Sequence, residues 1–105
     1  MAFAVFLYVD KPVASLQFDL DAAGSVTSTI DPALQKQVVT NRLPDGKLRV
    51  LVYGLNQSVF NGKFASVDSP VSSIKNVVGA NPDGTDAGVT VLKVSSPQGV
   101  AVEVK

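Results

Sequence analysis

The chain has 105 residues and a mass of 10.9 kDa, which fits a single domain over residues 1–105 and leaves no room for a second independent core. Hydrophobic residues make up 46% of the chain, which is too many for a disordered segment. Nine basic and nine acidic residues are spread along it and cancel, whereas a nucleic-acid binder normally gathers a basic excess on one face. The composition therefore predicts a folded domain and disfavours nucleic acid as its partner.

The first predicted element is an apolar strand over residues 1–9. This run stops at Asp10, far short of the ~20 apolar residues that a membrane span needs, and it lacks the basic leader of a signal peptide. We therefore expect no membrane span and, if the protein is exported, a leader that has been removed. The chain has no Cys, which fits an exported bacterial domain or a virus particle as well as the cytosol.

Period-two alternation predicts the strands that follow. Residues 16–20 alternate apolar and polar side chains, which is typical of a strand with one wet face. Residues 48–53 carry apolar side chains on both faces, which predicts a central strand. Further strands are expected at 74–78 and 89–94, and a closing strand with a charged outer face at 100–105.

Helical signal is confined to residues 32–37, where we expect Asp31 as the N-cap and Pro32 as the first helical residue. Turn signals recur along the rest of the chain at a spacing typical of sandwiches and barrels. They include Asp10-Lys11-Pro12, Pro44-Asp45-Gly46 and Asn61-Gly62. The sequence therefore predicts an all-β fold, a single Ig-like or jelly-roll β-sandwich of about eight or nine strands.

Three segments resemble the cohesin-type domain family. Residues 13–20 are similar to a family strand with a buried Leu/Phe/Leu row, residues 46–56 to its central strand and the bend after it, and residues 74–84 to its late strand and turn. The resemblance implies a shortened, cohesin-like β-sandwich. It also implies a protein that binds another protein, a dockerin-type module, through one face of a sheet.

No catalytic constellation stands out. The chain has no His and no Cys, which removes the commonest general base, metal ligand and thiol nucleophile. Asp19 and Asp21 lie two residues apart on a predicted strand, so we expect both on the same wet face. They fit an acid/base pair, half of a cation site, or a solvated outer face, and we favour the last. We therefore expect no enzyme.

One loop has the residue types of a cation site. Asn81, Asp83 and Asp86 supply oxygen ligands at a spacing like that of a calcium loop, with Gly84 for the bend. No later Glu closes the set, and Asx-type turns account for the same residues. We therefore expect no obligatory cofactor and keep calcium as a possible ligand.

A second stretch has the composition of an interaction patch. Tyr53 stands before Gly54, which lets the strand bend, and Asn56 and Gln57 follow beside Leu55, which predicts a protein-binding surface. The alternative is that Asn56 satisfies backbone groups at a tight turn. Aromatic residues are few and Trp is absent, so a sugar-binding row is not indicated.

Three functions remain open at this point. The first is a non-catalytic protein-recognition module of cohesin-like type. The second is a structural assembly protein, such as a virion decoration or a surface-layer or appendage subunit, whose apolar first strand adds to the sheet edge of another copy. The third is an extracellular carbohydrate-binding module. In each case we expect the protein outside the cell or on a cell or virion surface.

Overall fold

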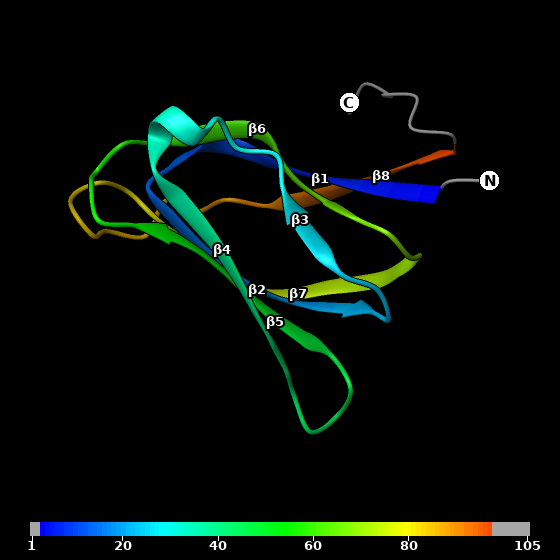
Figure 1. Cartoon of the computed structure of the whole chain (residues 1–105). Coiled ribbons are helices and arrows are strands. Elements are labelled where there is room, and N and C mark those ends of the chain that lie inside the picture. The colour runs from blue at the N-terminus through cyan, green and yellow to red at the C-terminus, as the bar shows by residue number, and fades with distance from the viewer. Residues whose placement is uncertain (1–2, 98–105) are drawn as a thin grey trace.

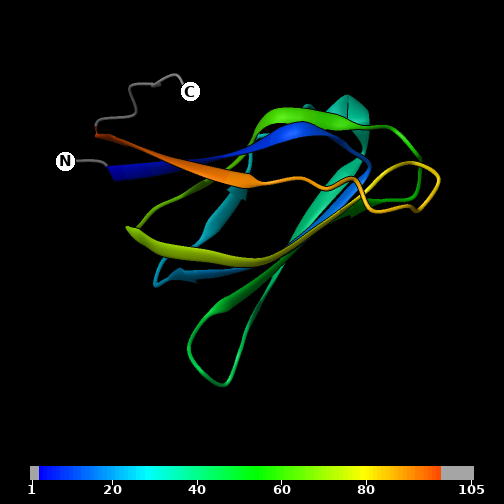
Figure 2. The same cartoon turned by 180° about the vertical axis from the view of Figure 1, so that it is seen from behind.

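The structure, a computed structural model, describes residues 3–97 and is a β-sandwich of two four-stranded antiparallel sheets (Figures 1 and 2). The predicted all-β fold is confirmed. A single 3-10 turn accompanies the strands in the described part of the chain. The elements are β1 (Phe3–Val13), β2 (Ser15–Ala22), β3 (Val26–Ser28), η1 (Pro32–Leu34), β4 (Lys36–Arg42), β5 (Leu48–Gly54), β6 (Phe60–Val67), β7 (Val71–Ala80) and β8 (Val91–Pro97).

The two sheets have the strand orders β3-β6-β1-β8, here called sheet A, and β4-β5-β2-β7, here called sheet B. In Figure 1 sheet A lies above sheet B, and the β4–β5 hairpin extends below the rest of the molecule. The chain passes from sheet A to sheet B at Ala14, between β1 and β2. Consecutive strands therefore supply both layers, so the core closes through contacts between residues far apart in sequence.

The inward side chains of both sheets form one apolar core. Phe18 of β2 and Phe64 of β6 are fully buried and meet edge to face, with ring centroids 5.8 Å apart, and Phe60 lies 5.9 Å from Phe64. Gly79 of β7 is buried against Val89, and a Cβ there would stand 2.5 Å from the Val89 side chain, so the position favours glycine. The other large buried side chains are Val5, Leu7, Val9, Val13, Leu16, Leu20, Leu48, Val50, Val52, Val67, Val71 and Val91.

The central strand and the hairpin turn agree with their sequence predictions. β5 lies between β4 and β2, with Val50 and Val52 facing the core. At the tip of the β4–β5 hairpin the amide of Leu43 donates to the carbonyl of Lys47, and Gly46 adopts a positive φ of 90°. The closing strand predicted at 100–105 lies outside the described residues.

The predicted helix at 32–37 is wrong in length. Asp31 caps the first turn as expected, its side chain accepting a hydrogen bond from the amide of Ala33. The turn is a 3-10 turn that ends at Leu34, because Gln35 takes a left-handed conformation with φ 57°. β4 then starts at Lys36, where the β-branched pair Val38 and Val39 favours strand.

Two further predictions about β1 are corrected. β1 lies inside sheet A, paired to β6 and β8, so its backbone is not free to join the sheet of another copy. Asp10-Lys11-Pro12 is not a turn but the irregular end of β1, where the pairing with β6 shifts register between Val9 and Val13. Asn61-Gly62 lies inside β6 opposite this irregularity, so the positive φ of Gly62 serves the strand rather than a hairpin turn.

Candidate functional site

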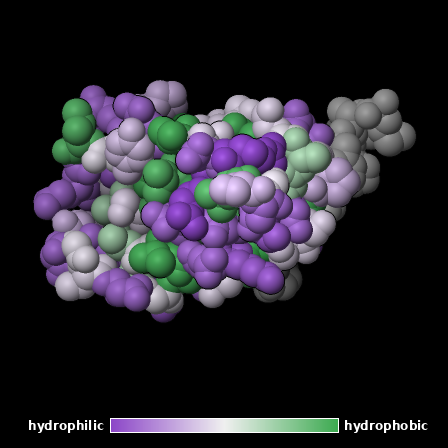
Figure 3. All heavy atoms as spheres, turned by 90° about the horizontal axis from the view of Figure 1, so that it is seen from below, coloured by the Kyte–Doolittle hydropathy of each residue, from purple (hydrophilic) through white to green (hydrophobic). Residues whose placement is uncertain are grey.

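The exposed large apolar side chains gather on one side of the molecule. Within residues 4–94, for which side-chain burial is described, all of them lie on the outer face of sheet B or on the β5–β6 loop; they are Val39, Tyr53, Leu55, Val59 and Val78. Figure 3 views the molecule from the sheet B side and shows apolar patches between hydrophilic areas. A face that collects such side chains is a candidate contact surface.

The register of sheet B explains the position of these residues. Val39 of β4 is opposite Leu51 of β5, Leu51 is opposite Gln17 of β2, and Gln17 is opposite Val78 of β7. Their neighbours along each strand point into the core, so this row points outward. The row crosses all four strands and carries no charge. We call it, together with Tyr53, the apolar face.

Two shallow hollows lie at this end of sheet B and share Tyr53. Hollow 1 has a volume of about 570 Å³ and hollow 2 of about 380 Å³. Hollow 1 is lined by Gln35, Lys36, Gln37, Tyr53, Gly54 and Leu55. Hollow 2 is lined by Ser15, Leu16, Gln17, Leu51, Val52, Tyr53, Val78 and Ala80, none of them charged. The two hollows therefore have one aromatic residue in common.

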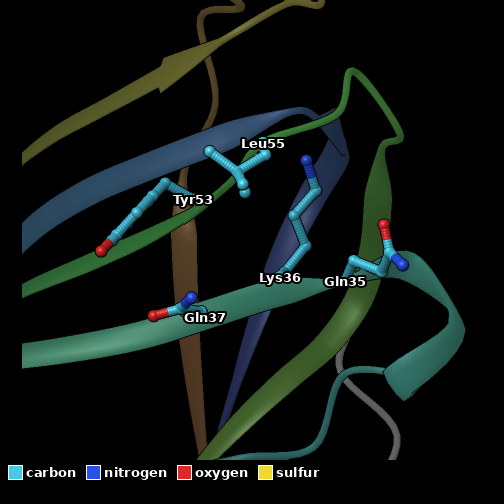
Figure 4. A pocket seen from close by; sticks show the side chains of 6 residues that line it. Gln35, Lys36, Gln37, Tyr53 and Leu55 are labelled. Carbon is cyan, nitrogen blue, oxygen red and sulfur yellow. The ribbon is translucent and has the colours of Figure 1, made fainter.

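Gly54 shapes hollow 1 by allowing close approach of the chain after η1. A Cβ at Gly54 would stand 2.6 Å from the carbonyl oxygen of Gln35 and 3.0 Å from Cδ of Lys36. Lys36 lies across this position, and its ammonium donates to the carbonyl of Asn56 at 3.2 Å. Partial burial lowers the pKa of Lys36 below its ordinary value. In Figure 4 Tyr53 and Gln37 point to one end of the hollow, whereas Lys36 and Leu55 extend at the other.

Of the three residues predicted as an interaction patch, Tyr53 belongs to both hollows. Asn56 is engaged within the protein: its side chain donates to Oε1 of Gln35 and accepts from the amide of Ser58. The Gln57 side chain donates to the carbonyl of Pro82, which joins the β5–β6 loop to the β7–β8 connection. The contacts of Asn56 are those of the tight-turn alternative, so Tyr53 alone of the three stands on the apolar face.

The predicted calcium residues form a hydrogen-bonded loop after β7. Asp83 Oδ1 accepts from the amide and the hydroxyl of Thr85, which lowers the pKa of Asp83. The side chain of Asn81 donates to the Thr85 hydroxyl, and Asp86 accepts from the amide of Gly88. Each of these side chains thus supports a turn. The described residues contain no group of three or more acidic side chains placed to hold a metal ion.

Asp19 lies on the outer face of sheet B as predicted, but the prediction that it is solvated is wrong, because neighbouring side chains bury its carboxylate. It accepts from Nε of Arg49 at 2.8 Å, from Nη2 of Arg49 at 3.2 Å and from Nδ2 of Asn76 at 2.8 Å. Hydrogen bonds from Arg49 and then Asn76 lower the pKa of Asp19. Asp21 is half-buried and shares none of these partners. The two carboxylates therefore form neither an acid/base pair nor a joint cation site.

Sequence reasoning missed most of the site. The predicted helix at 32–37 includes Lys36 and Gln37, and the predicted strand at 74–78 gives Val78 no role in binding. The available signal was the alternation of residues 36–42, which places Gln37 and Val39 on one side of a strand and Val38 on the other. Gln35 lines hollow 1, where its carbonyl lies close to Gly54. No local sequence pattern reveals this approach.

A comparison with protein-family models, curated proteins and solved structures found no match to this chain. In the part of the chain that the structure describes, no helix has the length and hydropathy of a membrane-crossing segment.

Proposed function

We propose that this protein is a non-catalytic protein-recognition module of cohesin-like type that contacts its partner through the apolar face of sheet B. The observation that carries the proposal is the gathering of all the exposed large apolar side chains of residues 4–94 on this face and the adjoining loop. Single exposed apolar residues are normal on any protein, whereas their gathering on one side favours a surface that another molecule covers. We further propose that the protein acts outside the cell or on a cell or virion surface.

The outer face of sheet A is a poorer contact surface. Its apolar side chains are half-buried; they are Phe6, Tyr8, Leu92 and Val94. The ammonium of Lys63 lies 4.7 Å from the centre of the Phe6 ring and covers part of that face. The difference in exposure between the two faces supports sheet B as the binding side.

The partner class is a dockerin-type module or, as the second candidate, another copy of the chain. The uncharged lining of hollow 2 and the net charge of zero favour self-assembly, since two copies meeting there would not repel each other. Carbohydrate is disfavoured because Tyr53 is the one exposed aromatic side chain within residues 4–94 and forms no row with others.

Binding measurements on a matched pair of variants test the proposal. Tyr53→Ser with Val78→Ser alters the apolar face, and Tyr8→Ser with Val94→Ser makes the same changes on the outer face of sheet A. We expect the native chain and the sheet A variant to bind a member of a panel of dockerin-type modules in titration calorimetry, and the sheet B variant to bind at least tenfold more weakly.

Sedimentation equilibrium of the chain alone and an affinity gel with soluble polysaccharides complete this test. Self-association that only the sheet B variant loses supports assembly of copies instead. Retardation by a polysaccharide, or the absence of every interaction up to millimolar concentration, contradicts the recognition of a protein.

A further inference from the structure

Lys36 is the one charged side chain in the lining of hollow 1. It is half-buried, and no carboxylate of the described residues pairs with it. Its ammonium carries three donors, of which the carbonyl of Asn56 takes one at 3.2 Å. Two donors therefore point to solvent or to a ligand in the hollow.

Two other basic side chains lie on the outer face of sheet B. Lys75 of β7, opposite Asp19, lies outside both hollows, and Arg49 is already engaged. Arg49 of β5 forms an ion pair with Asp19 at 2.8 Å, and that carboxylate is also bound by Asn76. Hollow 2, on the far side of Tyr53, has no charged lining residue. Hollow 1 thus offers one unpaired positive charge, on a side chain that points away from Tyr53 and Gln37 (Figure 4), and hollow 2 offers an uncharged, largely apolar surface.

We infer that the partner of this face presents a carboxylate beside a large apolar side chain. The carboxylate accepts hydrogen bonds from Lys36 in hollow 1, and the apolar side chain packs against Tyr53 and Val78 in hollow 2. The inference rests on the proposed function, because it specifies the partner of the same surface.

The charge on Lys36 selects against other partners. Partial burial already lowers the pKa of this ammonium, so covering it with an uncharged partner would remove more of its water without replacement. A basic partner would be repelled. A carboxylate replaces the water lost from the Lys36 ammonium, because it accepts a charge-assisted hydrogen bond from it.

A peptide-display selection tests the inference. Random displayed 12-residue peptides are selected on the immobilised native chain and counter-selected on the Tyr53→Ser, Val78→Ser variant. We expect enriched peptides to combine Asp or Glu with a neighbouring Leu, Ile, Phe or Trp. Fluorescence anisotropy then compares each synthetic peptide with its Asn or Gln counterpart, and replacing the acid is expected to weaken binding about fivefold.

The Lys36→Gln variant is expected to bind the acidic peptide about fivefold more weakly than the native chain does. It should then bind the acidic peptide and its Asn or Gln counterpart with equal affinity. Lys75→Gln, which removes an exposed lysine of β7 outside both hollows, is the control and leaves the difference intact. If peptides are enriched but neither the acid nor Lys36 affects their binding, the inference is wrong and the proposed function stands. If no peptide is enriched over the counter-selected variant, both are wrong.

Discussion

Replacing Phe64 by Ala is expected to lower the free energy of unfolding by about 3–5 kcal/mol. Phe64 of sheet A is fully buried and packs edge to face on Phe18 of sheet B, so its ring joins the two layers. Its removal also leaves Phe60 without an aromatic neighbour at 5.9 Å. A domain of this size has a total stability of roughly 5–15 kcal/mol, so the change consumes a large part of it.

Urea denaturation followed by circular dichroism measures this loss. The control is Leu55→Ala, which truncates a fully exposed side chain and is expected to change stability by less than about 0.5 kcal/mol. If Phe64→Ala does not fold, Phe64→Leu provides a milder variant with an expected loss of about 1–2 kcal/mol. A loss below about 1 kcal/mol for the Ala variant would contradict the packing of the two sheets through this ring.

Replacing Asp19 by Asn is expected to cost about 1–2 kcal/mol at neutral pH. The change removes the charged carboxylate that accepts hydrogen bonds from Arg49 and Asn76. The loss is moderate because the half-exposed Arg49 side chain can form hydrogen bonds with water instead. Asp21→Asn is the matched control on the same strand, since the Asp21 side chain makes no hydrogen bond or ion pair within the described residues. Its expected change is below about 0.5 kcal/mol.

The contribution of Asp19 has a defined pH dependence. The pKa of Asp19 is lowered in the folded state, whereas in the unfolded chain it returns to about 3.9. The stabilisation is therefore fully present above about pH 5 and is lost as the pH falls through the folded-state pKa. Denaturation curves from pH 7 to pH 2 should show the native chain and Asp19→Asn converging in acid. A constant difference across this range would rule out the ionised carboxylate as the cause.

The fold was predictable where local pattern determines structure. Alternation identified the inward residues of β2 and β5, and the Asp-Gly pair at 45–46 identified the hairpin tip. Strand pairing was not predictable, because the neighbours of β1 are β6 and β8, more than 40 residues away. For that reason β1 was expected to be available to another copy, although it lies inside its sheet.

The site was predictable only in part. Tyr53 is predicted because it precedes Gly54, where the strand was expected to bend, and stands near Leu55 and polar neighbours. The burial of Asp19 was missed because it depends on Arg49 across the sheet and on the left-handed Asn76, which interrupts the β7 register. Both contacts come from strands that the local sequence of β2 does not specify.

The central claim, that the outer face of sheet B is the contact surface, is tested most directly by mapping amide chemical shifts. The labelled native chain is titrated with the tightest peptide from the selection or with the bound dockerin-type module. We expect the largest shifts at Gln17, Leu51, Tyr53 and Val78, and no response from Phe6, Tyr8 and Leu92 of sheet A. Shifts confined to the outer face of sheet A would contradict it.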